Sequence, residues 1–288
     1  MTVNKQQPVR NKDVRVRRAI GHTFTHLFLI FFSLLMLLPF AWMVLSSFKT
    51  DSQILSVPIK WFPETWHFSN YIDTWNIAPW GTYFKNTVFI TLASIAGQLV
   101  VASMGAYAFA RLNFKGKNLM FVIYLSTMML PYQVTMIPMF KIVRTLGWMD
   151  TLTSQIVPSF FSVFGVFMLR QFFFAIPSEL EDAAAIDGCG YIMRYWEIIM
   201  KNSKPALVTL TLFIFMGKWN DFLGPLLYLN EKELWTLSLG LSKFKGQYTS
   251  MWSSMMCGAV ISILPIMIVF LFAQKYFIEG MVMSGIKG

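Results

Sequence analysis

Charged residues are scarce in this chain. Asp, Glu, Lys and Arg together make up 13% of its 288 residues, whereas a soluble domain usually carries about 25%. Hydrophobic residues account for 56% of the chain and aromatic residues for 17%. This balance excludes an ordinary soluble domain and indicates a polytopic membrane protein.

Cysteine and histidine are also few. The chain has two cysteines and three histidines, and neither set has the spacing of a disulfide framework or a metal site. It contains no G-x-x-x-x-G-K-[ST] phosphate loop, and no nucleophile–base or carboxylate pair that indicates catalysis. We therefore expect that the chain is not an enzyme and supplies no catalytic residue, metal ligand or cofactor site of its own.

The net charge of +10 does not indicate a nucleic-acid partner, because the basic residues form no face with interleaved aromatics. They lie between apolar runs, where they orient a protein in a bilayer. A basic tail, 1–21, precedes the first apolar run. That run is too long for a signal-peptide core and no A-x-A cleavage site follows it, so we expect an uncleaved membrane helix.

Six segments are apolar enough to cross a membrane, which takes about 20 residues each. They cover approximately 25–47, 86–109, 118–137, 153–175, 205–228 and 256–278. In the second of them Ala93, Gly97 and Gly105 share one helical stripe, and small residues let membrane helices approach closely. We therefore predict an all-α polytopic fold, with the tail 1–21 followed by one tightly packed six-helix domain, 22–288.

An even number of spans puts both termini on one side of the membrane. The segments on that side hold 15 Lys and Arg residues, and the segments on the other side hold eight. The positive-inside rule therefore places both termini, and the loop 176–204, in the cytoplasm. The opposite loops carry seven of the ten tryptophans, which form either an interfacial aromatic belt or a docking surface for an external protein.

The loop 176–204 is polar, and its sequence predicts a helical hairpin. The first helix should begin at a capping box, in which Ser178 and Glu181 each bond the backbone of the other. It should end at Gly188, because glycine adopts the left-handed conformation that terminates helices at little steric cost.

Each helix of this hairpin should present one distinctive face. In the first helix a face of mainly small side chains comprises Leu180, Ala183 and Ala184. This face fits either the groove of a partner protein or the inner leaflet of the membrane. In the second helix an apolar stripe at i, i+3, i+4 and i+7 comprises Ile192, Tyr195, Trp196 and Ile199, and the spacing of Glu197 and Lys201 favours an ion pair.

Several stretches resemble a known family. "EDAAAIDG" is similar to the EAA motif in the membrane subunits of bacterial ABC importers, with the match on Asp182, Ala183, Ala184 and Gly188. "GAYAFARLNFKGK", "LPYQVTMIPMF", "KWNDFLGPL" and the tail "QKYFIEGMVMSGIKG" resemble the carbohydrate branch, the MalG-like permeases. Two positions depart from the family pattern: Asp182 replaces the usual Glu, and Met200-Lys201 replaces a Leu-Pro pair.

The resemblance implies a type I ABC importer permease in a bacterial plasma membrane. The hairpin would then be the coupling helix that docks into a cytoplasmic ATPase, through Glu181, Asp182, Ala183, Ala184, Asp187 and Gly188. The tail residues Ser284, Gly285 and Lys287 would also reach the ATPase. The implied partners are a second permease subunit forming a heterodimer, two ATPase subunits that bind ATP and Mg, an extracytoplasmic sugar-binding protein, and membrane lipid.

Polar residues within apolar spans are candidates for the path of the substrate. They are Gln133, Asn220 and Asp221, and Trp219 beside Asn220 would add the aromatic platform that sugar sites often use. An alternative interpretation is that Lys218 and Asp221 form an i,i+3 ion pair that only holds helices together. The sequence therefore predicts the permease subunit of an ATP-driven carbohydrate importer. The alternative is an ion-coupled secondary transporter, which would show an internal repeat and several intramembrane acids.

Overall fold

The computed structural model describes residues 11–244 and 251–285, with side chains described for 21–244 and 251–274. The described residues contain helices and connecting segments and no strand. Four helical stretches are long and apolar enough to cross a membrane, namely Gly21–Ser46, Trp80–Arg111, Thr153–Ala175 and Trp252–Gln274. Two further candidates are helix pairs bent by more than 40° at a short break. These stretches confirm the all-α polytopic prediction.

Four predicted spans correspond to observed helices. They are α1 (Asn11–Ser46), α4 (Trp80–Arg111), the run of α7 (Thr153–Ile156), η2 (Val157–Phe160) and α8 (Val163–Ala175), and α14 (Trp252–Gly285). Helix α4 starts six residues earlier than predicted, because the interfacial segment from Trp80 continues the same helix. Helix α1 likewise extends the first apolar run back into the basic tail.

The third predicted span, 118–137, is not one continuous helix. It consists of α5 (Lys117–Ser126) with the 3-10 turn η1 (Thr127–Met129), and of α6 (Tyr132–Thr145), which runs at 101° to them. Pro131 lies at the break, and the preceding Leu130 is extended, with ψ at 117°. Proline causes this bend because its ring disfavours a helical conformation in the residue before it.

The fifth predicted span, 205–228, is also interrupted. Helix α11 (Lys204–Trp219) ends at the polar pair Asn220-Asp221, and the short α12 (Leu223–Tyr228) begins after it. The Asp221 carboxylate accepts a hydrogen bond from the Gly224 N–H in the first turn of α12 at 3.2 Å, so its side chain bonds the chain that follows α11. Short side-chain acceptors of this kind compete with helix interiors and favour helix starts.

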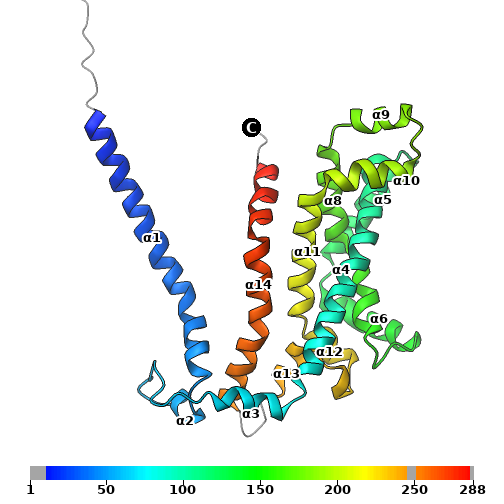
Figure 1. Cartoon of the computed structure of the whole chain (residues 1–288). Helices are drawn as coiled ribbons and strands as arrows, with labels where there is room; N and C mark the ends of the chain where they lie inside the picture. The colour runs from blue at the N-terminus through cyan, green and yellow to red at the C-terminus, as the bar shows by residue number, and fades with distance from the viewer. Residues whose placement is uncertain (1–10, 245–250, 286–288) are drawn as a thin grey trace, which may run out of the picture.

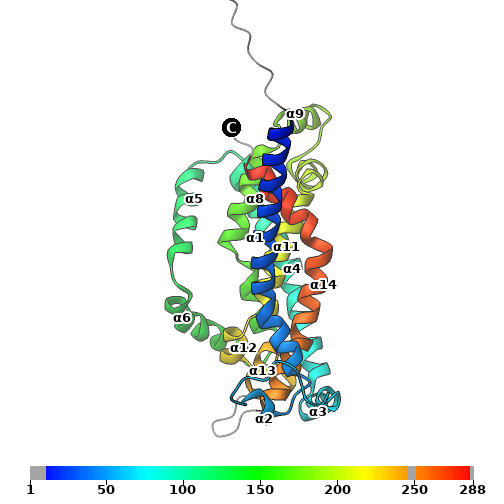
Figure 2. The ribbon, with the colours of Figure 1, turned by 90° about the vertical axis from the view of Figure 1, so that its left-hand side faces the viewer.

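The helices run between two ends of the molecule (Figures 1 and 2). The hairpin end carries the start of α1, the end of α14, and the pair α9 (Glu179–Ile186) and α10 (Tyr191–Arg194). The loop end carries α2 (Asp51–Ile54), α3 (Ser69–Ile77), α12, the 3-10 turn η4 (Lys232–Leu234) and α13 (Leu237–Ser242). The described parts of α1 and α14 therefore have their terminal ends on the side that carries the hairpin.

The core lies where α4 packs against α8 and α11. Its fully buried side chains include Ala102, Ala106, Leu169, Phe173 and Leu210. On the predicted small-residue stripe, a Cβ at Gly97 would lie 2.0 Å from the Phe160 ring, and one at Gly105 would lie 3.2 Å from Val166. The glycines therefore allow the close approach of α4 to η2 and α8 that the sequence predicted.

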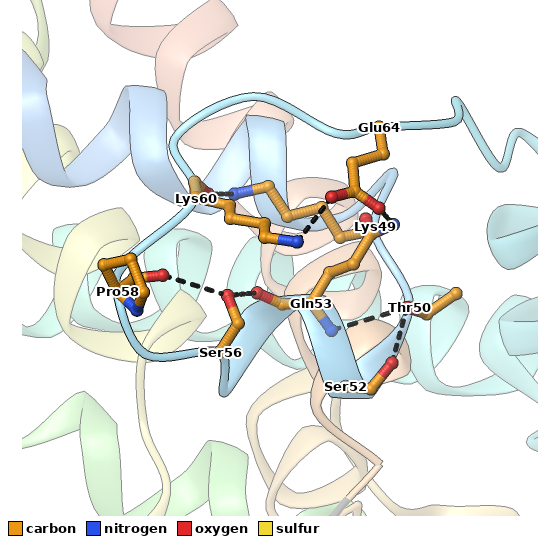
Figure 3. Close-up of polar contacts among 8 residues, drawn as sticks. All are labelled: Lys49, Thr50, Ser52, Gln53, Ser56, Pro58, Lys60 and Glu64. Atoms are coloured by element: carbon orange, nitrogen blue, oxygen red, sulfur yellow. Dashed lines mark hydrogen bonds and ion pairs between the residues drawn. The ribbon is translucent and has the colours of Figure 1, made fainter.

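A compact loop at the loop end holds the chain between α1 and α3 (Figure 3). Lys49 is fully buried; its Nζ donates to the Lys60 carbonyl at 2.6 Å and lies 3.9 Å from the centroid of the Trp42 ring. Lys60 in turn pairs with Glu64, and this ion pair lowers the pKa of the Glu64 carboxyl. The loop is thus anchored to the last turn of α1 through the ammonium group of Lys49.

The tryptophans assigned to the loop end have different environments. Trp61, Trp66 and Trp75 are about half exposed. Trp80 is fully buried, stacks on Phe244, and donates from its indole N–H to the Thr74 carbonyl at 2.8 Å. Trp80 therefore belongs to the core, and the choice between an aromatic belt and a docking surface concerns the exposed rings alone.

Candidate functional site: a helical hairpin and a polar cavity

The coupling-helix candidate, α9, is closed by a complete Schellman motif. The Cys189 N–H bonds the Ala184 carbonyl at 2.9 Å, and the Gly188 N–H bonds the Ala185 carbonyl at 3.1 Å. Gly188 has φ at +83°, a conformation that favours glycine. The sharp helix end that the sequence predicted at Gly188 is therefore present.

The predicted capping box at the start of α9 is wrong. The Ser178 backbone is itself helical, at φ −68° and ψ −26°, and its side chain makes no capping hydrogen bond. A capping serine needs an extended backbone to present its oxygen to the first turn. The Glu181 side chain instead turns inward, where it is buried against α4.

Arg111, the last residue of α4, joins three elements at this point. Its Nε lies 3.0 Å from a Glu181 carboxylate oxygen, and both side chains are nearly buried. Its Nη2 donates to the Phe173 carbonyl at 2.6 Å and to the Ile176 carbonyl. One guanidinium group therefore ties α9 to the ends of α4 and α8, and we call these contacts the Arg111 clamp.

The two motif alanines lie on different sides of α9. Ala184 is buried against the rest of the protein, as is Glu181. Asp182, Ala183 and Asp187 are exposed, and Ile186 is 87% exposed. The single face predicted from Leu180, Ala183 and Ala184 is therefore wrong: the buried side of α9 runs through Glu181 and Ala184, three residues apart, and leaves Leu180 and Ala183 exposed.

The second helix of the hairpin differs from the expected amphipathic α-helix. It continues from α10 into a π-helical turn, η3 (Tyr195–Met200). Tyr195 and Ile199 are buried, whereas Ile192 and Trp196 are more than half exposed, because the wider turn changes the register of the predicted stripe. The Tyr195 hydroxyl hydrogen-bonds the Ser103 hydroxyl at 2.7 Å, and the expected Glu197–Lys201 ion pair forms on the surface.

The predicted tail contacts fall at the edge of the described chain. Ser284 and Gly285 are the last residues of α14, at the hairpin end. Lys287 lies outside the described residues. The role of this tail stays a prediction.

A second candidate region is a cavity of about 610 Å³ between α6, α7–η2 and the α11–α12 break. Its polar lining includes Tyr132, Ser154, Gln155, Lys218, Asp221 and Tyr228. Asn220 also lines the cavity. Irregular backbone at membrane depth is tolerated where it is buried or lines a water-filled space, and the break carries Asn220 and Asp221 into this cavity.

The other two lining candidates lie elsewhere. Gln133 is exposed on α6 and is absent from the cavity wall. Trp219 is buried, stacks on Phe215, and donates from its indole N–H to the Ser262 carbonyl at 3.0 Å. Trp219 therefore packs at the end of α11 in the core, and its ring is not an aromatic platform for a sugar in this cavity.

Lys218 and Asp221 form the i,i+3 ion pair that the sequence offered as an alternative to a role in the substrate path. The Lys218 Nζ lies 3.6 Å from Asp221 Oδ2 and also donates to the Gln155 carbonyl at 3.2 Å. Sequence reasoning missed Gln155 and Tyr228 because both lie in apolar segments that were interpreted as plain helix. The polar residues at 154, 155 and 159, clustered at the start of an apolar span, were the available signal.

No group of three His, Cys, Asp or Glu side chains that could hold a metal ion occurs among the residues that the structure describes. The polar groups of the cavity are instead hydroxyls, amides and one ion pair. This arrangement is suited to binding a polar organic molecule by hydrogen bonds.

Comparison with known proteins gives consistent matches. Residues 98–282 match the family described as binding-protein-dependent transport system inner membrane component. The arabinooligosaccharides transport system permease protein AraQ of Bacillus subtilis (strain 168) is 36% identical, over 91% of this chain and 94% of that protein. The probable ABC transporter permease protein YurM of the same organism is 31% identical, over 98% and 96%.

The fold also matches a solved structure. A chain in the crystal structure of a bacterial ABC transporter involved in the import of the acidic polysaccharide alginate superposes with a TM-score of 0.79. The match covers 94% of this chain and 100% of that chain, at 24% sequence identity. At this identity the likeness shows a shared fold.

Proposed function

The chain belongs to the family of binding-protein-dependent transport system inner membrane components, the permease subunits of ABC importers, and from this premise we propose that it imports carbohydrate. It is a multi-pass protein of the inner membrane. The two relatives named above are both described as permeases, and one of them as an arabinooligosaccharide permease. In our proposal this chain forms half of the translocation path, and a second, different permease subunit forms the other half.

We propose that α9 couples this path to a cytoplasmic ATPase. The observation that carries the proposal is the Arg111 clamp, which ties α9 to α4 and α8 while the opposite side of α9 stays exposed. A short helix closed by Gly188 and held in this way moves as a rigid element. Displacement of α9 by the ATPase would therefore shift the ends of two core helices.

The chemistry of ATP hydrolysis would belong to the partners. Two ATPase subunits would bind ATP and Mg and would contact Asp182, Ala183, Asp187 and Gly188 on the exposed side of α9. Glu181 and Ala184 would act from the inner side by fixing the helix. The end of α14, with Ser284 and Gly285, and the following tail residue Lys287 would add a second contact. An extracytoplasmic binding protein would deliver the sugar at the loop end.

Within the membrane, we propose that Asn220 and Asp221 line the translocation path, with Gln133 on the neighbouring α6. The cavity at the α11–α12 break supports the roles of Asn220 and Asp221, because both line it. Gln133 is exposed on α6 outside the cavity wall, and its role rests on its polarity within an apolar span. Trp219 would hold this break in place through its packing and its bond to Ser262.

Site-directed crosslinking tests the coupling proposal. A cysteine at Ala183, in a Cys189→Ser background, should crosslink to the ATPase in the purified complex, since Ala183 is exposed. Cys257 is fully buried and can be retained. The control is Asn76→Cys, which is exposed on α3 at the loop end and should give no ATPase crosslink.

The crosslinking result has a clear contrary outcome. If Ala183→Cys reacts only with lipid-phase reagents, or if Asn76→Cys gives the ATPase crosslink, α9 is not the coupling element. Sugar uptake into proteoliposomes tests the transport mode. Uptake should require ATP and survive collapse of ion gradients, whereas an ion-coupled secondary transporter would show the reverse.

A further inference from the structure

The compact loop between α1 and α3 has an exposed apolar side, which we call its outer face. The outer face consists of Leu55, Val57, Ile59, Trp61 and Phe62. Val57 is 95% exposed and Phe62 is 72% exposed. Single apolar residues on a surface need no explanation, but a group of them marks a site of interaction with a protein or a membrane.

Polar side chains of the same loop bond within the loop (Figure 3). Gln53 donates from Nε2 to the Glu64 carboxylate at 3.4 Å, and Lys60 forms an ion pair with that carboxylate. The Ser56 hydroxyl donates to the Gln53 carbonyl at 2.9 Å. A polar group leaves water at a high cost unless it is hydrogen-bonded. These internal bonds therefore lower the cost of moving the loop into a less polar environment.

Two contacts with Trp42 set the position of the loop along α1. The Trp61 ring meets the Trp42 ring edge-on, with the centroids 5.3 Å apart. The ammonium group of Lys49 lies 3.9 Å from the centroid of the Trp42 ring and donates to the Lys60 carbonyl. Trp42 belongs to the apolar stretch Gly21–Ser46, and it precedes the end of that stretch by about 6 Å along the helix axis. Trp61 therefore lies beside a spanning helix and not beyond its end.

The outer face continues the apolar surface of α1. The chain between α2 and α3 lies beside the last turns of α1, on the side away from α14 (Figure 1). In these turns α1 exposes Phe40 and Val44, and none of its most apolar stretch is buried against other described residues. Aromatic rings such as that of Trp61 are enriched where the hydrocarbon of a bilayer meets the headgroups. Lipid therefore fits the outer face.

We propose that residues 55–62 dock into the bilayer leaflet at the loop end and anchor the end of α1 there. The contacts of Trp61 and Lys49 with Trp42 hold the outer face at the depth of the headgroup boundary, where apolar side chains of surface-bound segments are buried. A soluble binding protein would not reach a face at this depth. In this proposal Trp61 belongs to an aromatic belt, and the binding protein docks on other parts of the loop end.

Fluorescence quenching in a bilayer tests the docking. Ile59→Cys and Phe62→Cys, each in a Cys189→Ser background, are labelled with the environment-sensitive fluorophore NBD, and the buried Cys257 is retained. The complete complex is reconstituted in vesicles of phosphatidylcholine and phosphatidylglycerol. Phosphatidylcholine with a nitroxide near the headgroup end of one acyl chain should quench both labels, whereas aqueous iodide should leave both largely unquenched.

Three variants sharpen the test. Asn76→Cys is the control label, because Asn76 is polar and exposed on α3 at the same end, and iodide alone should quench it. Lys49→Met removes the bond to the Lys60 carbonyl, and Trp61→Ala removes the ring contact with Trp42. In either background the label at position 62 should lose quenching by the nitroxide lipid and become quenched by iodide.

Three results would overturn the proposal. Quenching of both labels by iodide alone would place the outer face in water. Protection of both labels from iodide and from the nitroxide lipid would show that another subunit of the complex covers this face. Unchanged quenching by the nitroxide lipid in both Lys49→Met and Trp61→Ala would show that the contacts with Trp42 do not hold the loop. None of these results bears on sugar uptake, which tests the proposed function separately.

Discussion

Gly188 sets the end of α9 through its backbone conformation. Its φ of +83° is one that residues with a Cβ adopt at a cost, and no atom lies within 4 Å of the position where a Cβ would be. The effect of a substitution there is therefore conformational and not steric. Gly190, two residues later, has φ at −70° and equally open surroundings, so it provides a matched comparison.

We expect Gly188→Ala to destabilise the end of α9 by about 1–2 kcal/mol, the cost of a left-handed conformation for a residue with a side chain. ATP-driven uptake should fall, because the coupling helix frays. Gly190→Ala should leave uptake and thermal stability close to those of the wild type. Uptake in proteoliposomes and thermal melting in detergent measure the two effects, and equal behaviour of both variants would contradict this account.

At the scale of the element, the clamp and the α4–η2 contact join neighbouring helices. The guanidinium of Arg111 contacts two carbonyls of the α8 end and the carboxylate of Glu181. Lysine cannot reproduce this, because it offers a point charge in place of a planar fork. The Glu197–Lys201 pair lies on the same hairpin but is mostly exposed, and surface pairs of this kind contribute little.

Arg111→Lys and Glu181→Gln should each reduce sugar transported per ATP hydrolysed, because α9 is no longer held to α4 and α8. Glu181→Gln leaves the guanidinium without its carboxylate, and breaking a buried ion pair in this way costs about 3–5 kcal/mol, so the apparent melting temperature of this variant should also fall. Lys201→Gln is the control and should change neither quantity. If Arg111→Lys transports as much sugar per ATP hydrolysed as the wild type, the clamp does not transmit motion.

Gly97 tests the packing between α4 and η2. A Cβ on this residue would lie within 2.4 Å of three atoms of the Phe160 ring, so Gly97→Ala should displace the ring and cost about 1–3 kcal/mol. Gly217→Ala on α11 is the control, because no atom lies within 4 Å of its Cβ position. Size-exclusion chromatography after heating should show earlier loss of the Gly97→Ala protein, and equal melting of both variants would contradict the packing argument.

The sequence predicted the helices whose signal is local and missed features that depend on tertiary contacts. Apolar runs located four spans, and the glycine at 188 located the end of α9. The break near Asp221 was missed because hydropathy averages over single polar residues. The capping box failed because Glu181 gains more from burial against Arg111 than from a backbone bond to Ser178, and no local pattern reveals Arg111 as that partner.

At the scale of the whole molecule, the two ends have different roles in our proposal. The hairpin end carries α9, the start of α1 and the end of α14. The loop end carries the compact loop, α12 and α13, and there Asp150 accepts from the Asn230 amide at 3.0 Å, which lowers the pKa of the Asp150 carboxyl. The excess of basic residues in segments at the hairpin end predicts that it faces the cytoplasm.

Labelling with a membrane-impermeant maleimide tests this orientation. Asn113→Cys, in the connection between α4 and α5, should react in inside-out vesicles only, because this connection lies at the hairpin end. Asn76→Cys on α3 should react in intact spheroplasts only. The reverse pattern would place α9 outside the cell and would rule out contact with a cytoplasmic ATPase.

The separation of α1 from the rest of the chain has a consequence for how an isolated subunit unfolds. None of the most apolar stretch of α1 is buried against other described residues, and α1 diverges from α14 toward the hairpin end (Figure 1). Its melting should therefore be only loosely cooperative with that of the α4–α8–α11 core. A subunit that is not assembled into the transporter would expose this helix to lipid. Quality-control proteases could use that exposure to identify unassembled subunits.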